Sequence, residues 1–141
     1  MKIPLGIDGS RYALAATRFV CESLAQPGRQ VDMMHVLPLV IQEGAAAPRN
    51  RPESLRVPPL SRSRLDRAER RLHFRGFSVA SRVRRGAPNR VLPEVAAKGG
   101  YDLIVLGAKG RADNPHLPTG SVALQVARYA PCSVLLVRGS L

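Results

Sequence analysis

The chain of 141 residues is predicted to form a single α/β domain, covering residues 1–141, around a parallel β-sheet. Two runs, LIVL at 103–106 and VLLV at 134–137, are apolar at every position, which is typical of parallel strands covered by helices on both faces. Three other strand-like segments alternate with helical patterns, without an internal repeat. We therefore expect a doubly wound, Rossmann-like sheet of five strands in the order 3-2-1-4-5, with helices on both faces.

The first half of the chain is expected to supply two strands and one helix. IPLGI forms the first strand, and Ser10 can cap a helix that ends at Pro27-Gly28. A second strand is expected at 30–37. The segment 38–60 contains five prolines and no periodicity, which predicts a mobile loop.

The second half is expected to supply three more strands, each preceded by a helix. Pro88 suits the first turn of one of these helices, whereas Pro93 would remove a backbone hydrogen bond and bend the helix or delay its start. The expected elements are helix 61–75, strand 77–83, helix 88–98, strand 103–106, helix 120–130 and strand 134–137.

Three glycines and a serine form a GxxGx9GS pattern between the fourth strand and the last helix: Gly107, Gly110, Gly120 and Ser121. Glycine allows backbone N–H groups to approach an anion closely, and a helix start adds N–H donors and a positive dipole end. This pattern predicts a nucleotide phosphate site. The alternative is that the glycines only permit a tight turn and close packing of helix on strand.

Asp8 follows the first strand, at the edge of the sheet where the fourth strand also ends. With strands one and four as neighbours, this edge is the topological switch point, and one ligand could touch both Asp8 and the glycine pattern. The alternative is a carboxylate that only stabilises the Gly9-Ser10 turn or the start of the first helix.

The composition narrows the class of protein. No apolar stretch approaches the length of a membrane span and no secretory signal is seen, so a cytoplasmic location is expected. Cys21 and Cys132 form no CxxC pair and are expected to be reduced, packed thiols, and we predict neither a metal site nor a catalytic residue. His35 is expected to be a structural histidine at a strand end.

The net charge of +12 raises the question of a nucleic-acid partner. Six arginines lie on the helix at 61–75, opposite an expected inward stripe of Leu65, Ala68 and Leu72. A solvated helix face explains this charge, and no base-stacking platform is evident on a strand, so nucleic acid is not the expected partner.

Several segments resemble the universal stress protein family: GIDGS at 6–10, HV at 35–36, DLIVLGAKGR at 102–111, GSVA at 120–123 and APCSVLLVR at 130–138. The resemblance covers the whole chain, and the GxxGx9GS pattern is that of the ATP-binding branch. It implies ATP as ligand, with or without Mg²⁺, and a role in stress adaptation. The chain departs from the family pattern at Pro115, His116 and Pro118.

The resemblance also implies a role for each residue of the site. Asp8 would lie on the adenosine side, the backbone of Val36 would contact adenine, and Leu106 would pack near the sugar or base. Lys109 and Arg111 would add positive charge, although ordinary surface residues explain them equally well. The phosphates would be held by Gly107, Gly110, Gly120, Ser121 and Val122.

Three functions remain open at this point. The first is an ATP-binding regulator with at most slow hydrolysis, since neither GxxxxGK[ST] nor a cluster that would activate water is found. The second is an interaction module that has lost nucleotide, and the third is a basic nucleic-acid-binding protein. The resemblance implies a homodimer formed through the last strand, between Val134 and Arg138, and an unidentified protein partner.

Overall fold

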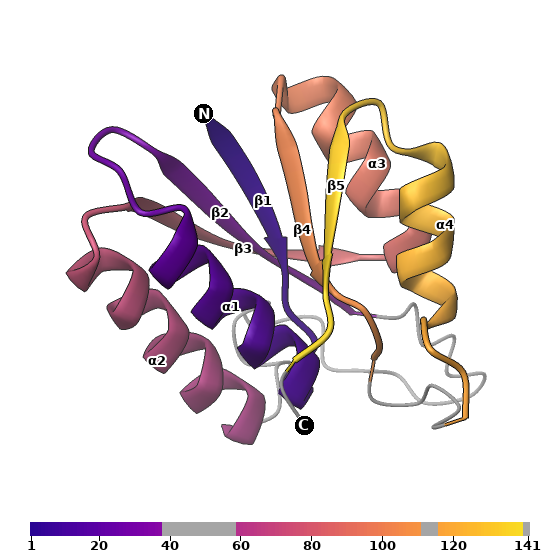
Figure 1. The fold of residues 1–141 in the computed structure, drawn as a ribbon, viewed down its shortest axis with the longest axis horizontal. Coiled ribbons are helices and arrows are strands. Elements are labelled where there is room, and N and C mark those ends of the chain that lie inside the picture. The colour runs from indigo at the N-terminus through magenta and orange to yellow at the C-terminus, as the bar shows by residue number, and fades with distance from the viewer. Residues whose placement is uncertain (38–58, 111–115, 140–141) are drawn as a thin grey trace, which may run out of the picture.

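The computed structural model describes residues 1–37, 59–110 and 116–139. Residues 38–58 of the predicted mobile loop lie outside this part of the chain, whereas Pro59 and Leu60 are not loop but the first residues of a helix. The elements in order are β1 (Lys2–Gly6), α1 (Arg11–Ser23), β2 (Gln30–Leu37), α2 (Pro59–Phe74), β3 (Ser78–Arg85), α3 (Pro88–Gly99), β4 (Leu103–Gly107), α4 (Ser121–Tyr129) and β5 (Ser133–Val137) (Figure 1).

The five strands form one parallel sheet in the order β3-β2-β1-β4-β5, which confirms the predicted fold. β2 and β3 pair along their whole length, from Gln30 opposite Ser78 to Leu37 opposite Arg85. β1 lies between β2 and β4. The chain therefore adds β2 and β3 on one side of β1, and then β4 and β5 on the other side. The switch point lies between the carboxyl ends of β1 and β4.

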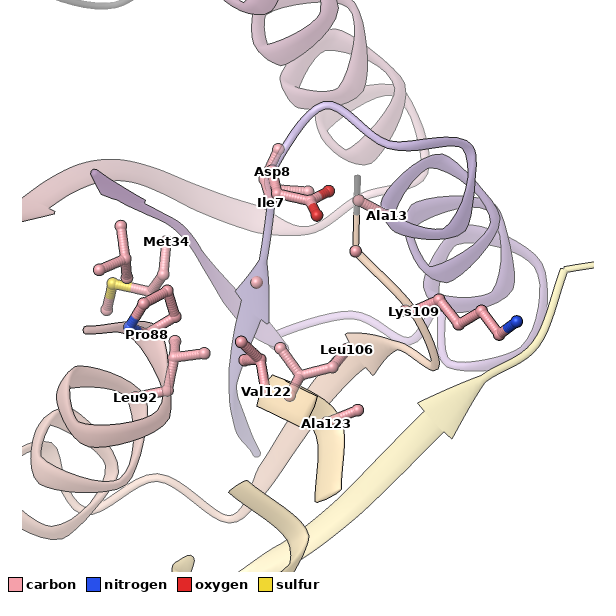
Figure 2. Close-up of a pocket in the computed structure, with 14 residues that line it drawn as sticks. Ile7, Asp8, Ala13, Met34, Pro88, Leu92, Leu106, Lys109, Val122 and Ala123 are labelled. Atoms are coloured by element: carbon pink, nitrogen blue, oxygen red, sulfur yellow. The ribbon is translucent and has the colours of Figure 1, made fainter. Parts of the chain in front are cut away.

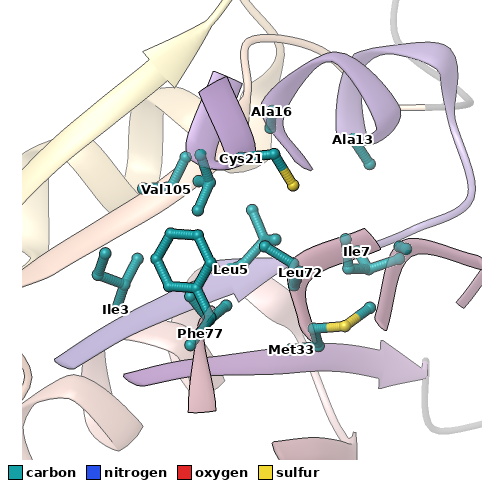
Figure 3. Close-up of a cluster of buried hydrophobic side chains, with 13 residues drawn as sticks. Ile3, Leu5, Ile7, Ala13, Ala16, Cys21, Met33, Leu72, Phe77 and Val105 are labelled. Atoms are coloured by element: carbon teal, nitrogen blue, oxygen red, sulfur yellow. The ribbon is translucent and has the colours of Figure 1, made fainter. Parts of the chain in front are cut away.

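Helices cover both faces of the sheet and define two apolar cores. α1 and α2 pack on one face, where Ile3, Leu5 and Met33 of the strands meet Ala16 of α1 and Leu72 of α2 (Figure 3). α3 and α4 pack on the other face, where a smaller core is formed by Met34, Leu92, Ala96, Ile104, Leu106 and Val126. The expected inward residues Ala68 and Leu72 of α2 are buried, and Leu65 packs against the same core.

Local signals explain most helix ends. The hydroxyl of Ser10 accepts a hydrogen bond from the N–H of Ala13 at 3.1 Å, which confirms the predicted cap of α1. α1 ends at Ser23, earlier than the predicted stop at Pro27-Gly28. α3 begins at Pro88 and runs through Pro93 without a delayed start, ending before Gly100, whose φ of 62° is left-handed.

The two edges of the sheet differ in chemistry. β3 forms one edge and carries Arg82, Arg84 and Arg85, of which Arg82 and Arg84 are exposed. β5 forms the other edge and consists of apolar, half-buried residues after Ser133. Among the described helices, none is long and apolar enough to span a membrane.

Candidate functional site

A pocket opens at the carboxyl ends of the strands, beside the switch point between β1 and β4. Its wall combines segments that lie far apart in the sequence: the ends of β1, β2 and β4, the loops after β1 and β4, and the first turns of α1, α3 and α4 (Figure 2). Seven of the predicted site residues line it: Asp8, Val36, Leu106, Gly107, Lys109, Gly110 and Val122.

The loop after β1 holds Asp8 in a defined turn. Its carboxylate oxygen Oδ1 accepts a hydrogen bond from the N–H of Ser10 at 2.8 Å, and Gly9 has a φ of 76° that favours glycine. The N–H of Ile7 donates to the carbonyl of Met34 at 2.8 Å, which fixes the loop to the end of β2. Asp8 therefore has the turn-stabilising role that the sequence left open as an alternative, and it also lines the pocket.

Gly107 lies where the end of β4 passes the start of α1. A Cβ added at this position would lie 2.6 Å from the carbonyl carbon of Tyr12 and 2.9 Å from the backbone nitrogen of Ala13. These backbone atoms cannot move aside without shifting α1. Close packing of helix on strand therefore requires glycine here, which is the alternative explanation of the glycine pattern.

The first turn of α4 forms the remaining side of the pocket. The N–H of Gly120 donates to the carbonyl of Ala108 at 2.7 Å, so this predicted phosphate donor already has an acceptor. The start of α4 carries the positive end of the helix dipole, which favours an anion beside it. Val122 lines the pocket, whereas Gly120 and Ser121 do not, and Arg111 lies outside the described residues.

Half of the pocket lining was not predicted from the sequence. The additional residues are Gly6, Ile7, Ala13, Met34, Pro88, Leu92 and Ala123. Pro88 had a usable signal, because a proline at a helix start that follows a strand lies at the carboxyl edge of the sheet. The others are ordinary apolar residues of strands and helices, which carry no separate signal of ligand contact.

The lining is mostly apolar, and among the residues that the structure describes its two ionisable side chains are Asp8 and Lys109. Figure 2 shows the amine of Lys109 directed away from the apolar side chains. The enclosed cavity has a volume of about 90 Å³, below the roughly 300 to 1,000 Å³ typical of ligand pockets. A nucleotide would place one group in this cavity and extend beyond it. Within the described residues, no group of three or more His, Cys, Asp or Glu side chains is arranged to hold a metal ion.

The remaining predicted polar residues lie away from the pocket lining. Cys21 is buried in the core between the sheet and helices α1 and α2, and Cys132 is half-buried. Both are free thiols, and burial raises the pKa of each. A raised pKa lowers the thiolate fraction, so neither residue is activated as a nucleophile. His35 is buried at the end of β2.

A doubly wound sheet with an apolar pocket at its switch point defines a class of α/β domains that bind ligands at the carboxyl edge of the sheet. Residues 1–138 match the model of the Universal stress protein family. The chain belongs to the universal stress protein family.

Known proteins agree with this assignment. A putative universal stress protein of Staphylococcus haemolyticus is 37% identical over 62 residues, which are 43% of this chain. The match spans only 38% of the length of that relative.

Solved structures share the fold over nearly the whole chain. The hypothetical protein MJ0577 has a TM-score of 0.77 at 20% identity, covering 99% of this chain and 96% of its own. A universal stress protein in complex with cAMP has a TM-score of 0.70 at 24% identity, covering 99% of this chain and 98% of its own. The universal stress protein of Archaeoglobus fulgidus in complex with dAMP has a TM-score of 0.69 at 21% identity, covering 98% of each chain.

Proposed function

We propose that this protein binds ATP in the pocket at the switch point and acts as a nucleotide-dependent regulator in stress adaptation. One observation carries the proposal: apolar walls from β2 and α3 meet the loop after β4 and the first turn of α4 in a single cavity. Apolar walls suit a purine base, and N–H groups at a helix start suit phosphates. The complexes of relatives with cAMP and dAMP support an adenine nucleotide as the class of ligand.

The proposed contacts divide between the two ends of the nucleotide. Val36 and Leu106 of the lining are proposed to contact adenine and the sugar, and Asp8 of the same lining is proposed to contact adenosine. Gly107 and Gly110 also belong to the lining and are proposed to lie beside the phosphates. The phosphates would be held there by N–H groups of the loop after β4 and of Ser121 and Val122, with Gly120 leaving room for their approach at the helix start and positive charge from Lys109 and Arg111.

Isothermal titration calorimetry with ATP tests the proposal. We expect a dissociation constant on the order of 1 to 10 μM, because four or five hydrogen bonds to charged oxygens can supply this affinity after ordering costs. Asp8→Ala and Gly110→Val are expected to abolish binding, the first by removing a carboxylate and the second by filling the approach to the phosphates.

Two further variants separate binding from folding. Asp8→Asn keeps an oxygen that can accept the N–H of Ser10, so it preserves the turn while removing the charge. Asp66→Ala removes an exposed carboxylate from α2, outside the pocket lining, and is expected to leave ATP binding unchanged. If Asp8→Ala and Gly110→Val both bind ATP as tightly as the unaltered chain, the site assignment is wrong.

The second candidate function is a dimeric interaction module that binds no nucleotide. The packing role of Gly107 and the engaged N–H of Gly120 favour it, because both explain part of the glycine pattern without a ligand. Purified protein without bound adenine, together with no calorimetric response to ATP, would support this function in place of the first.

We propose no dedicated catalytic step. Within the described part of the pocket lining, Asp8 is the one carboxylate, and its Oδ1 already accepts a hydrogen bond from the Ser10 N–H. Hydrolysis of bound ATP, with or without Mg²⁺, is therefore expected to be slower than the roughly 1 s⁻¹ at the low end of typical enzymes. We propose that the protein acts in the cytoplasm.

We also propose that the protein forms a homodimer through β5, between Val134 and Arg138. β5 ends the sheet, so its outer backbone groups are open to another strand. A groove beside it is lined by residues of α1 and β5 that include Ala15, Phe19, Leu135 and Val137. The groove also contains Arg18, Glu22 and Arg138. A groove that combines apolar side chains with charges of both signs, next to an open strand, suits a second copy of the same surface.

A further inference from the structure

The outer face of α2 carries a basic stripe with one aromatic side chain. Arg70 and Arg71 each lie three or four residues from both Arg67 and Phe74, so these four residues share one side of the helix. We call them the α2 stripe. All four are exposed, and Phe74 is 89% exposed. α2 packs against the sheet and α1 through its other side, at the margin of the molecule (Figure 1).

The acidic residues of α2 do not neutralise the stripe. Glu69 accepts a hydrogen bond from the hydroxyl of Ser81 on β3 at 2.9 Å, which directs its carboxylate toward the sheet. Considering only the residues that the structure describes, no acidic side chain lies within ion-pair distance of Arg67, Arg70 or Arg71. Residues 59–85 hold nine arginines against two acidic residues, a surplus of seven charges within the chain's net +12.

Phe74 is the one aromatic residue of the stripe. A single exposed apolar side chain is common on protein surfaces, so what distinguishes the stripe from a merely solvated face is the combination of Phe74 with three exposed arginines on one side of the helix. Arginines beside an exposed aromatic ring match the chemistry of a single strand of nucleic acid, whose phosphates pair with guanidinium groups while a base stacks on the ring. The sequence pattern did not predict this partner, because the stacking residue lies on a helix rather than on a strand face.

We propose that the α2 stripe binds single-stranded nucleic acid without strong sequence preference. Phe74 stacks with a base, and Arg67, Arg70 and Arg71 contact the phosphates on either side of it. The stripe contributes nothing to the described lining of the nucleotide pocket, so this binding does not depend on ATP.

Fluorescence polarisation of labelled oligo(dT) and oligo(U) of about 12 nucleotides tests the proposal, using the full chain with and without saturating ATP. Titrations at roughly 50 and 200 mM salt give the salt dependence. We expect binding that weakens steeply with salt and is the same with and without ATP. Phe74→Leu, which keeps an apolar side chain but removes the aromatic face, is expected to weaken binding by about fivefold or more.

A pair of double variants with equal charge change supplies the control. Arg67→Gln with Arg70→Gln is expected to reduce the slope of log K against log salt by about 1.4, because two phosphate contacts are lost. Lys98→Gln with Arg128→Gln removes the same charge from exposed positions on α3 and α4 and is expected to leave the slope unchanged. Circular dichroism of each variant checks that the fold is intact.

Four results would overturn the proposal. They are absence of binding at the lower salt, equal losses in the two double variants, displacement of the oligonucleotide by ATP, and binding to vesicles of anionic phospholipid without binding to the oligonucleotide. Equal losses in the two double variants would show attraction by net charge alone. Displacement by ATP would place the oligonucleotide in the nucleotide pocket, and binding to vesicles only would make a membrane surface the partner.

Discussion

Gly107 shows how one residue can satisfy two explanations of the same motif. The sequence pattern predicts a glycine that lets a phosphate approach, and the structure shows a glycine that lets β4 approach Tyr12 and Ala13 of α1. Both needs are met by the absence of a side chain. Sequence alone could therefore predict that this position matters but could not separate packing from ligand contact.

Gly107→Ala is expected to destabilise the protein in the absence of ATP by about 1 to 3 kcal/mol, because the added methyl group would overlap immobile backbone. Urea denaturation measures this change. Gly6→Ala is a useful comparison, since its added methyl group would meet the end of the flexible Leu106 side chain, and a smaller loss is expected. An unchanged denaturation midpoint for Gly107→Ala would show that packing does not require glycine here.

Asp32 is a buried carboxylate that no sequence pattern singles out. It lies on β2 with 1% of its surface exposed and accepts hydrogen bonds from the Tyr101 hydroxyl and from Nε2 of Gln30 at 2.9 Å. Nε of Arg82 on β3 lies 3.7 Å from it. The group links β2, β3 and the segment before β4 at the end of the sheet away from the pocket, so its contribution is to folding.

Tyr101 makes stability depend on pH in the alkaline range. Burial, followed by its hydrogen bond to Asp32, raises the pKa of Tyr101 from 10.0 to about 12. Because the folded pKa is the higher one, the stabilisation is complete below about pH 10 and is lost as the pH rises toward 12. Denaturation from pH 9 to 12 should therefore show a steeper loss for the unaltered chain than for Tyr101→Phe.

Absorbance of tyrosinate provides an independent reading of the same group. Tyr101→Phe should remove a titration step near pH 12, and at neutral pH it should lower stability by about 1.5 to 3 kcal/mol through loss of a hydrogen bond to a charged group. Identical pH dependence in the two proteins would refute the assignment.

At the scale of the elements, the sequence predicted which segments are helices and strands better than where they end. β2 was predicted at its observed bounds, 30–37, because Gly28 and the apolar run define it. α1 ends before the predicted stop at Pro27-Gly28. Leu24 is already the C-cap of the helix, and its N–H donates a hydrogen bond to the carbonyl of Val20. α2 begins at Pro59 within the predicted loop, and proline is well accepted in a first helical turn.

The sequence could predict only those parts of the site that contain glycines or a charged residue. Asp8 and the loop after β4 could be found because a carboxylate and two glycines directly follow buried strands. Met34 and Leu92 could not, because their roles as core residues and as pocket walls produce the same apolar pattern. Which apolar side chains face the cavity depends on the packing of α3, and periodicity alone does not report it.

At the scale of the whole molecule, the fold followed from the alternation of strands and helices together with the right-handed crossover rule. The order β3-β2-β1-β4-β5 then brings Asp8 and Gly107 to one edge, although they lie far apart in the sequence. The proposed dimer also depends on the order of the strands, because this order makes β5 one of the two edges of the sheet.

Phe19→Glu is expected to convert the dimer to a monomer, because it introduces a charge into the groove beside β5. Light scattering coupled to size-exclusion chromatography measures the mass. Leu14→Glu changes another exposed apolar residue of α1 that does not line the groove, and this variant should remain dimeric. A monomeric unaltered chain, or a Phe19→Glu protein that is still dimeric, would exclude this interface.

The arginines on β3 have a consequence for how far association can proceed. If two β3 edges approached each other, Arg82 and Arg84 of each copy would bring like charges together along the same line. Strand addition is therefore open at β5 and opposed at β3. In the proposed dimer the two β5 edges are used up by each other and the positive β3 edges are left outside, so the like charges of Arg82 and Arg84 oppose growth of the pair through two β3 edges.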